Sequence, residues 1–245
     1  MEPYLATILI FLLGSFTQGL TGFGFALVSI PLLVLFMDIR TAVPLCMLSG
    51  LVITAFLSLQ LKDHLDWRKI LPLLCGCLPG ILAGILFLKK INEPIFKILL
   101  GTMLISYSLY RLFLLPKPRS ISKGWGWVAG FATGAISAAF SAGGPPTIIY
   151  TTLTGWNKHE IKSTLSIFFF LGGVATAVAH AMSGLTTVEV IKLSAVSLPA
   201  VLTGVWSGSL LYKKFKTEGY LRLVLIGLIL MGLMMLYSAS ILQNY

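Results

Sequence analysis

Two long charge-free runs, residues 3–37 and 124–157, each contain a glycine cluster followed by proline. The first cluster covers residues 14–24, and the second covers residues 130–144 and directly precedes Pro145. Glycine lets backbones approach closely in apolar surroundings, whereas proline removes a hydrogen-bond donor and breaks helices. As one straight helix, about 34 residues would extend about 51 Å, well beyond a hydrocarbon core of about 30 Å. We therefore predict that both runs are interrupted near their glycines.

The composition indicates that the lipid bilayer is the environment of the chain. Of 245 residues, 57% are hydrophobic, and only 18 are basic and 8 acidic. Most charge-free runs reach the length of about 18 to 20 residues that crosses a bilayer as a helix. Lys97 and Arg111 flank a short fourth run and would let residues 94–115 span with both charged groups at the surface. Eight crossings are predicted, over residues 3–37, 41–61, 70–88, 98–110, 124–157, 163–188, 193–212 and 223–245.

The net charge of +10 does not indicate a nucleic-acid partner. The basic residues flank the hydrophobic runs and do not gather on one face, which is typical of membrane proteins. Basic residues are almost equally divided between the loops of the two sides, but neither terminal tail carries one. We expect a multi-pass protein of the inner membrane with both termini outside.

The second half of the chain repeats landmarks of the first, which indicates an internal duplication. Runs one and five are the longest, and each carries a glycine cluster. Gly84 matches Gly204, and Gly101 matches Gly227 near the middle of the last run of each half. Small residues spaced by four also recur in runs three and seven, where they permit close helix packing or sliding.

These patterns predict an all-α membrane protein with about eight transmembrane helices. The helices form two duplicated four-helix halves, and the first helix of each half is broken. Four crossings in each half would make the repeats parallel, whereas two half-crossings in the long first run would allow inverted repeats. The predicted units are a first repeat at residues 1–115, a linker at residues 116–124 and a second repeat at residues 125–245.

The side-chain inventory argues against an enzyme. All eight acidic residues lie in loops or at the ends of runs, and no HExxH metal-binding pair occurs. The three cysteines lie within runs and are interpreted as small apolar packing residues. His180 is either a proton relay or a histidine with a satisfied hydrogen bond. We expect no catalytic residues, no metal and no cofactor.

Uncharged polar residues and glycines around the two clusters form the candidate binding site. Hydroxyl and amide groups donate hydrogen bonds without the cost of a charge inside the membrane. A broken helix also exposes backbone N–H groups at a new N-terminus, where an anion is favoured. The alternative is a packed kink in which Ser and Thr bond to their own helix and the Gln amide bonds to a neighbouring helix. The candidate residues are Gln18, Thr21, Gly22, Gly24, Ser137, Ser141, Gly143, Gly144, Pro145 and Thr147.

The same residues carry a family resemblance over essentially the whole chain. Residues 19–25 with Pro31 resemble the first-repeat signature of the sulfite exporter TauE/SafE family of membrane permeases. Residues 143–146, with Tyr150 and residues 155–158, resemble its second-repeat signature. The resemblance implies transport of sulfur-containing anions such as sulfite or organosulfonates.

We therefore expect a permease for a small anion, with a sulfur oxyanion or an organosulfonate as substrate and a binding site between the two repeats. The expected partners are this substrate and the lipid bilayer, and the oligomeric state is left open. A permease for a neutral or cationic small molecule is one alternative. A membrane scaffold without transport activity is another, although it would not need polar, glycine-broken spans.

Overall fold

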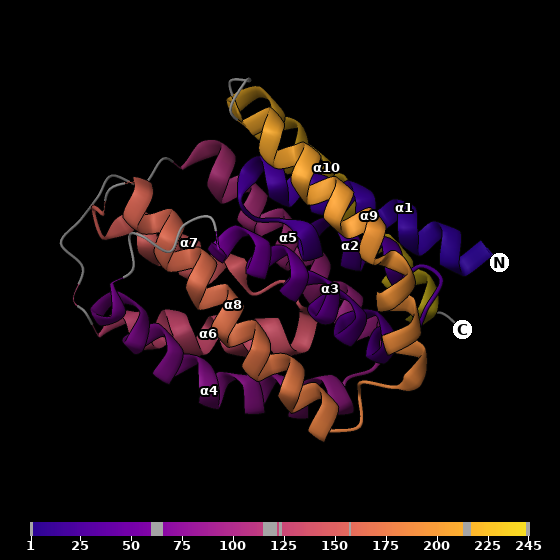
Figure 1. Ribbon diagram of the computed structural model, residues 1–245. Coiled ribbons are helices and arrows are strands. Elements are labelled where there is room, and N and C mark those ends of the chain that lie inside the picture. The colour runs from indigo at the N-terminus through magenta and orange to yellow at the C-terminus, as the bar shows by residue number, and fades with distance from the viewer. Residues whose placement is uncertain are drawn as a thin grey trace.

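The computed structural model describes residues 2–59, 66–114, 122, 124–156, 158–212 and 217–243, and these residues form ten helices (Figure 1). The linker predicted at residues 116–124 lies almost entirely outside the described residues. The helices are α1 (Glu2–Thr21), α2 (Phe25–Leu33), α3 (Ile39–Leu59), α4 (Trp67–Lys90), α5 (Glu93–Phe113), α6 (Trp125–Phe140), α7 (Gly144–Leu153), α8 (Lys158–Met182), α9 (Val188–Tyr212) and α10 (Thr217–Gln243).

Both long runs are interrupted at their glycine clusters, as predicted. The first breaks between α1 and α2, where Gly22 and Gly24 have φ angles of 83° and 107°. Side chains are disfavoured in this left-handed region, so glycine is the residue suited to it. The second breaks between α6 and α7, where Ser141 has a φ angle of 53°.

Among the described helices, seven are long and apolar enough to cross a membrane. They are α1, α3, α4, α5, α8, α9 and α10. The run predicted as the fifth crossing is not among the seven, because its predicted interruption divides it into helices α6 and α7 of 16 and 10 residues. The chain is an all-helical, multi-pass membrane protein over the residues described.

Each broken run folds back on itself instead of continuing through the break. Gln18 of α1 accepts a hydrogen bond from the N–H of Phe25, and a Cβ atom on Gly14 would overlap the hydroxyl of Ser29. Later residues of α2 thus lie beside earlier residues of α1, which makes the pair an antiparallel hairpin. We call α1 and α2 the first hairpin, and residues 22–24 its tip.

Helices α6 and α7 form a second hairpin, with its tip at residues 141–143. The hydroxyls of Thr133 and Thr147 are hydrogen-bonded to each other. Nearer the open end, a Cβ atom on Gly126 would lie 3.2 Å from the hydroxyl of Tyr150. The return of the chain explains why this run does not make one continuous crossing.

The two hairpins enter the helix bundle from opposite sides. The end of α1 lies beside the start of α10, because Thr17 and Tyr220 form a hydrogen bond of 3.0 Å. Helix α10 therefore ends on the side where α1 begins, which we call the terminal side (Figure 1). Helix α5 is antiparallel to α10, since Lys97 contacts Ser238 while Gly101 contacts Gly232. Helix α5 thus ends on the opposite side, and α6 begins there.

Glycines set the closest helix contacts of the bundle. Helix α4 packs along α6, and α9 packs along α1 (Figure 1). At each contact a Cβ atom on the glycine would overlap the backbone of the facing helix, so only glycine permits this separation. These glycines are Gly76, Gly80 and Gly84 of α4, Gly130 and Gly134 of α6, Gly19 of α1, and Gly208 of α9.

Lys97 does not reach the membrane surface, contrary to the expectation from the sequence. It is buried, 5% exposed, with Nζ 2.6 Å from Glu93 and 3.2 Å from the hydroxyl of Ser238. The carboxylate one turn away provides a counter-charge, which makes burial of the ammonium tolerable. Lys97 therefore joins α5 to α10 and has its charge compensated inside the protein.

Candidate functional site

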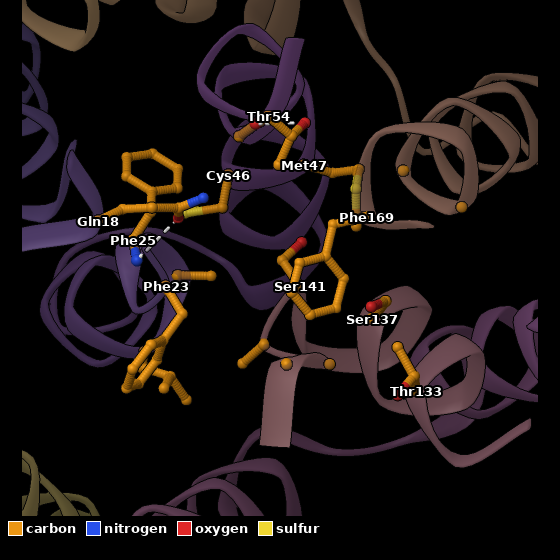
Figure 2. Close-up of a pocket in the computed structure, with 18 of the residues that line it drawn as sticks. Gln18, Phe23, Phe25, Cys46, Met47, Thr54, Thr133, Ser137, Ser141 and Phe169 are labelled. Atoms are coloured by element: carbon orange, nitrogen blue, oxygen red, sulfur yellow. Dashed lines mark hydrogen bonds between the residues drawn. The ribbon is translucent and has the colours of Figure 1, made fainter. Parts of the chain in front are cut away.

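A cavity of about 100 Å³ lies between the tips of the two hairpins. The first hairpin contributes Gln18 and Phe25, and the second contributes Ser137 and Ser141, with α3 and α8 closing the remaining sides (Figure 2). A buried water needs about 10 to 15 Å³ by such a measure, so this space is large enough for several waters or a small ligand. The tertiary fold thus brings both glycine clusters to one place.

Gln18 sets the chemistry of the first tip. Its Oε1 accepts a hydrogen bond of 3.1 Å from the N–H of Phe25, the first residue of α2 (Figure 2). An amide oxygen that accepts this bond leaves the NH₂ group of Gln18 as the free end, with two donors. The next N–H groups of α2, those of Ala26 and Leu27, have no acceptor within the helix because they lie in its first turn. Both residues line the cavity.

The second tip is fixed by a contact with α3. The hydroxyl of Ser141 donates a hydrogen bond of 2.7 Å to the carbonyl of Val43. Gly143 lies so close to α6 that a Cβ atom there would overlap the hydroxyl of Ser137 and the carbonyl of Thr133. Gly143 is the N-cap of α7 and Gly144 its first residue, and both line the cavity, so their two N–H groups have no acceptor within the helix, whereas Pro145 and Pro146 after them carry no N–H.

The cavity is therefore faced by the N-termini of two short helices. Helices α2 and α7 have 9 and 10 residues, and the residues at the start of each line the same space. Unpaired N–H groups and the helix dipole make each N-terminus electropositive. No charged side chain is among the residues that line the cavity. Its polar character comes from backbone N–H groups, hydroxyls and one amide.

Six of the ten predicted site residues line this cavity, and four do not. Thr21 is turned toward its own backbone and donates to the carbonyls of Thr17 and Phe23. Gly22 makes the turn at the first tip, whereas Pro145 and Thr147 belong to the interior of the second hairpin. The six lining residues are Gln18, Gly24, Ser137, Ser141, Gly143 and Gly144.

Helices α3 and α8 supply lining residues that the sequence analysis did not select. Thr54 of α3 adds a hydroxyl, but that hydroxyl donates to backbone carbonyls of its own helix. Gly172 and Gly173 of α8 leave room for the cavity. A glycine pair within an apolar run is the sequence feature that could have predicted this contribution of α8. Further lining residues are apolar and resemble ordinary packing positions in the sequence: Cys46, Met47 and Leu51 of α3, Phe168 and Phe169 of α8, and Cys77 of α4.

His180 lies beside the second hairpin but does not line the cavity. Its Nε2 is 2.9 Å from the carbonyl oxygen of Ala138, near the end of α6. Because a carbonyl only accepts, Nε2 carries the proton of this bond. The last carbonyls of a helix lack partners within it, so His180 satisfies one of them. This arrangement fits the hydrogen-bonded alternative, and a proton-relay role stays a prediction.

Comparison with known proteins supports the resemblance inferred from the two signatures. No curated protein and no solved structure shows a significant match to the chain. The sulfite exporter TauE/SafE family matches residues 6–235, which include both hairpin tips and all or most of each of the seven helices long enough to span. The chain belongs to the sulfite exporter TauE/SafE family of membrane transporters.

Proposed function

We propose that this protein is an inner-membrane permease for a small anion, with a sulfur oxyanion or an organosulfonate as substrate, and that the anion binds in the central cavity. The observation that carries the proposal is the convergence of two helix N-termini on one cavity without a charged lining side chain. A helix N-terminus stabilises an anion through its N–H groups and its dipole. Two of them together with an amide provide a neutral site that an anion can enter and leave.

The polarity of the lining favours an anion over a cation. The oxygen of Gln18 is engaged by Phe25, which leaves its NH₂ donors available for a ligand. A cation would need carboxylates or free carbonyl oxygens, and no Asp or Glu is among the lining residues. A neutral ligand would gain little from two helix N-termini. The lining therefore favours a small-anion permease over a permease for a neutral or a cationic molecule.

Ser141 acts in this proposal as a positioning residue. Its hydroxyl proton is directed at the carbonyl of Val43, so it is not available to a ligand in this conformation. The bond instead holds the N-terminus of α7 at the cavity wall. Gly143 serves the same end, because the absence of a side chain lets the tip close against Ser137.

An inverted repeat is the symmetry that best accounts for the helix directions. Each half would consist of one hairpin followed by three long helices, with the hairpins entering from opposite sides. Aromatic contacts are consistent with this: Phe23 at the first tip packs on Tyr107 of α5, and Phe140 beside the second tip packs on Phe96 at the other end of α5.

The glycine contacts change which residues correspond in the two halves. Gly80 faces the carbonyl of Phe131 of α6, and Gly204 faces the equivalent carbonyl of Leu12 in α1. This pairs Gly204 with Gly80, one helical turn from the match with Gly84 that the sequence landmarks predict. Gly101 and Gly232 face each other across α5 and α10, whereas a Cβ atom on Gly227 would meet nothing within 4 Å. This pairs Gly101 with Gly232 and not with Gly227, the match that the sequence landmarks predict.

The proposed transport movement is a displacement of the hairpins along glycine-lined surfaces. Each hairpin packs on a long helix of the other half, α1 on α9 and α6 on α4. Rocking of related halves about a central site is the usual form of alternating access in transporters with inverted repeats. Movement of either tip would open the cavity toward one side of the membrane.

Flux measurements in proteoliposomes test the proposal directly. We expect uptake of radiolabelled sulfite, or of a simple alkanesulfonate, that saturates and is inhibited by the other anions of the panel. The matched panel contains a neutral sulfone and an organic cation of similar size. Saturable flux of the neutral or cationic compound with none for any anion would refute the proposal, and flux of none would favour a scaffold.

A further inference from the structure

Beside the first hairpin, α5 carries three polar side chains that each have a buried atom without a partner. These atoms are Oη of Tyr107, Oγ of Ser108 and Nε of Arg111, none of which forms a hydrogen bond to any described residue. Tyr107 is 4% exposed and Ser108 is fully buried. Tyr107 and Ser108 lie four and three positions before Arg111, so each of them shares a helix face with Arg111.

The charge of Arg111 has no counter-ion in the part of the chain that the structure describes. Lys97, the other cation on the buried face of α5, has Glu93 one turn away as its counter-ion. No described carboxylate forms an ion pair with Arg111. Burying an unpaired guanidinium N–H and two unpaired hydroxyls costs free energy, and a ligand of opposite charge that accepts their hydrogen bonds would remove much of this cost.

The three side chains lie between the opposite side of the membrane and the central cavity. Arg111 is partly exposed in the last turn of α5, which ends on that side. Tyr107 lies one turn deeper, and its ring meets Phe23 edge-on at a centroid distance of 6.1 Å. Phe23 in turn lines the cavity (Figure 2). The order from solvent inward is therefore Arg111, Tyr107, Phe23 and the cavity.

We propose that Tyr107, Ser108 and Arg111 form a second binding site for a small oxyanion, which the anion occupies before or after the central cavity. A guanidinium group suits oxyanions because its planar N–H groups bind two oxygens at once. The two hydroxyls add donors, and Phe23 separates the second site from the cavity. The inference rests on the proposed function for the identity of the anion, but not for the existence of the site.

A lipid phosphate has the same chemistry, but the depth of the cluster favours an anion from solution. A headgroup at the membrane surface would reach the partly exposed Arg111. Tyr107 and Ser108 are buried behind it, and Tyr107 packs on Phe23 at the hairpin tip, deeper than a headgroup at the surface would lie. A small oxyanion can contact all three side chains.

Equilibrium binding of radiolabelled sulfite to the purified protein in a neutral detergent counts the sites. We expect two anions bound per chain for the wild type and one for Arg111→Gln. Tyr107→Phe retains the ring against Phe23 and removes only the hydroxyl, so its affinity at the second site should fall about tenfold or more. Arg68→Gln is the matched control, because Arg68 is exposed at the start of α4 on the same side.

Two results would overturn the inference. One is a wild-type protein that binds a single anion with an affinity unchanged in Arg111→Gln. The other is sulfite binding at this site that added phosphatidylglycerol abolishes, with one tightly bound lipid lost in Arg111→Gln, which would assign the cluster to a headgroup. Conversely, if Gly143→Ala leaves sulfite stoichiometry unaltered and one anion is still lost in Arg111→Gln, the second site stands and the central site of the proposed function fails.

Discussion

The two hairpin tips reach the same cavity by different local means. The first tip turns at Gly22 and Gly24, both with positive φ angles, and its N-terminus is capped by Gln18 from within the hairpin. The second turns at Ser141, a residue with a side chain in the left-handed region, and is bonded to Val43 of α3. One tip is held by its own hairpin, and the other is held by the surrounding bundle.

This difference suggests different tolerances in the two tips. At the first tip the backbone conformation itself demands glycine, since a side chain at a positive φ angle costs about 1 to 2 kcal/mol. At the second tip the limiting factor is space, because the chain at Gly143 lies directly against α6. The same function, presenting a helix N-terminus to the cavity, thus depends on conformation in one case and on close packing in the other.

The largest expected effect is that of Gly143→Ala at the second tip. The added methyl group would overlap the hydroxyl of Ser137 and the carbonyl of Thr133, so the tip must move away from α6. We expect anion flux to fall by at least about tenfold, since such overpacking costs about 1 to 3 kcal/mol. Gly144→Ala is the matched control, because its Cβ would lie 3.5 Å from the nearest atom, an ordinary contact. Equal flux in both variants would show that space does not limit this tip.

Gln18→Leu is expected to have the next largest effect, acting through the first tip. Leucine removes both the acceptor for the N–H of Phe25 and the amide donors that we assign to the anion. Loss of a helix cap costs about 1 kcal/mol, and loss of a donor to a charged ligand costs about 1.5 to 3 kcal/mol. The affinity for sulfite in flux assays should fall about tenfold or more. Gln18→Glu retains the acceptor but adds a negative charge, so a normal affinity in that variant would contradict an anion site.

Gly24→Ala tests the conformational requirement of the first tip through stability. With a φ angle of 107° at this position, alanine should lower the free energy of unfolding by about 1 to 2 kcal/mol. Gly227→Ala is the control, because Gly227 is helical, has no atom within 4 Å of its Cβ position, and should gain up to about 1 kcal/mol. Thermal unfolding in detergent compares the two. A similar stability change in both variants would show that the backbone conformation at Gly24 does not require glycine.

The smallest effect is expected for substitutions of Ser141, which test the bond between the second tip and α3. Ser141→Ala removes the hydrogen bond to Val43 and keeps a side chain at a positive φ angle, at a cost of about 1 kcal/mol. Ser141→Gly removes the same bond but relieves the backbone, so it should be the more stable of the two. Comparing their unfolding temperatures and sulfite affinities separates anchoring from strain. A Ser141→Ala variant as stable as the wild type would show that the bond to Val43 is not needed.

The sequence alone determined the membrane environment, the interruption of both long runs, and six of the residues that line the cavity. These follow from local physics: run length against bilayer thickness, the freedom of glycine, and the cost of polar groups in lipid. His180 and Lys97 could be recognised as polar groups needing partners, but the sequence did not identify those partners. Ala138 and Glu93 provide them, one of them across the fold.

The tertiary structure alone decided the hairpin geometry and the lining residues that α3 and α8 supply. It also decided that Thr21, Pro145 and Thr147 do not line the cavity. A glycine cluster permits a kink, a continued crossing or a reversal, and the reversal here accompanies packing of α2 on α1 and α3 and of α7 on α6 and α8. Likewise, a hydroxyl in an apolar run can face a ligand or its own helix, because both satisfy its hydrogen bonds equally well. Which one occurs depends on the neighbouring helices, because the local sequence does not specify contacts between residues that are distant along the chain.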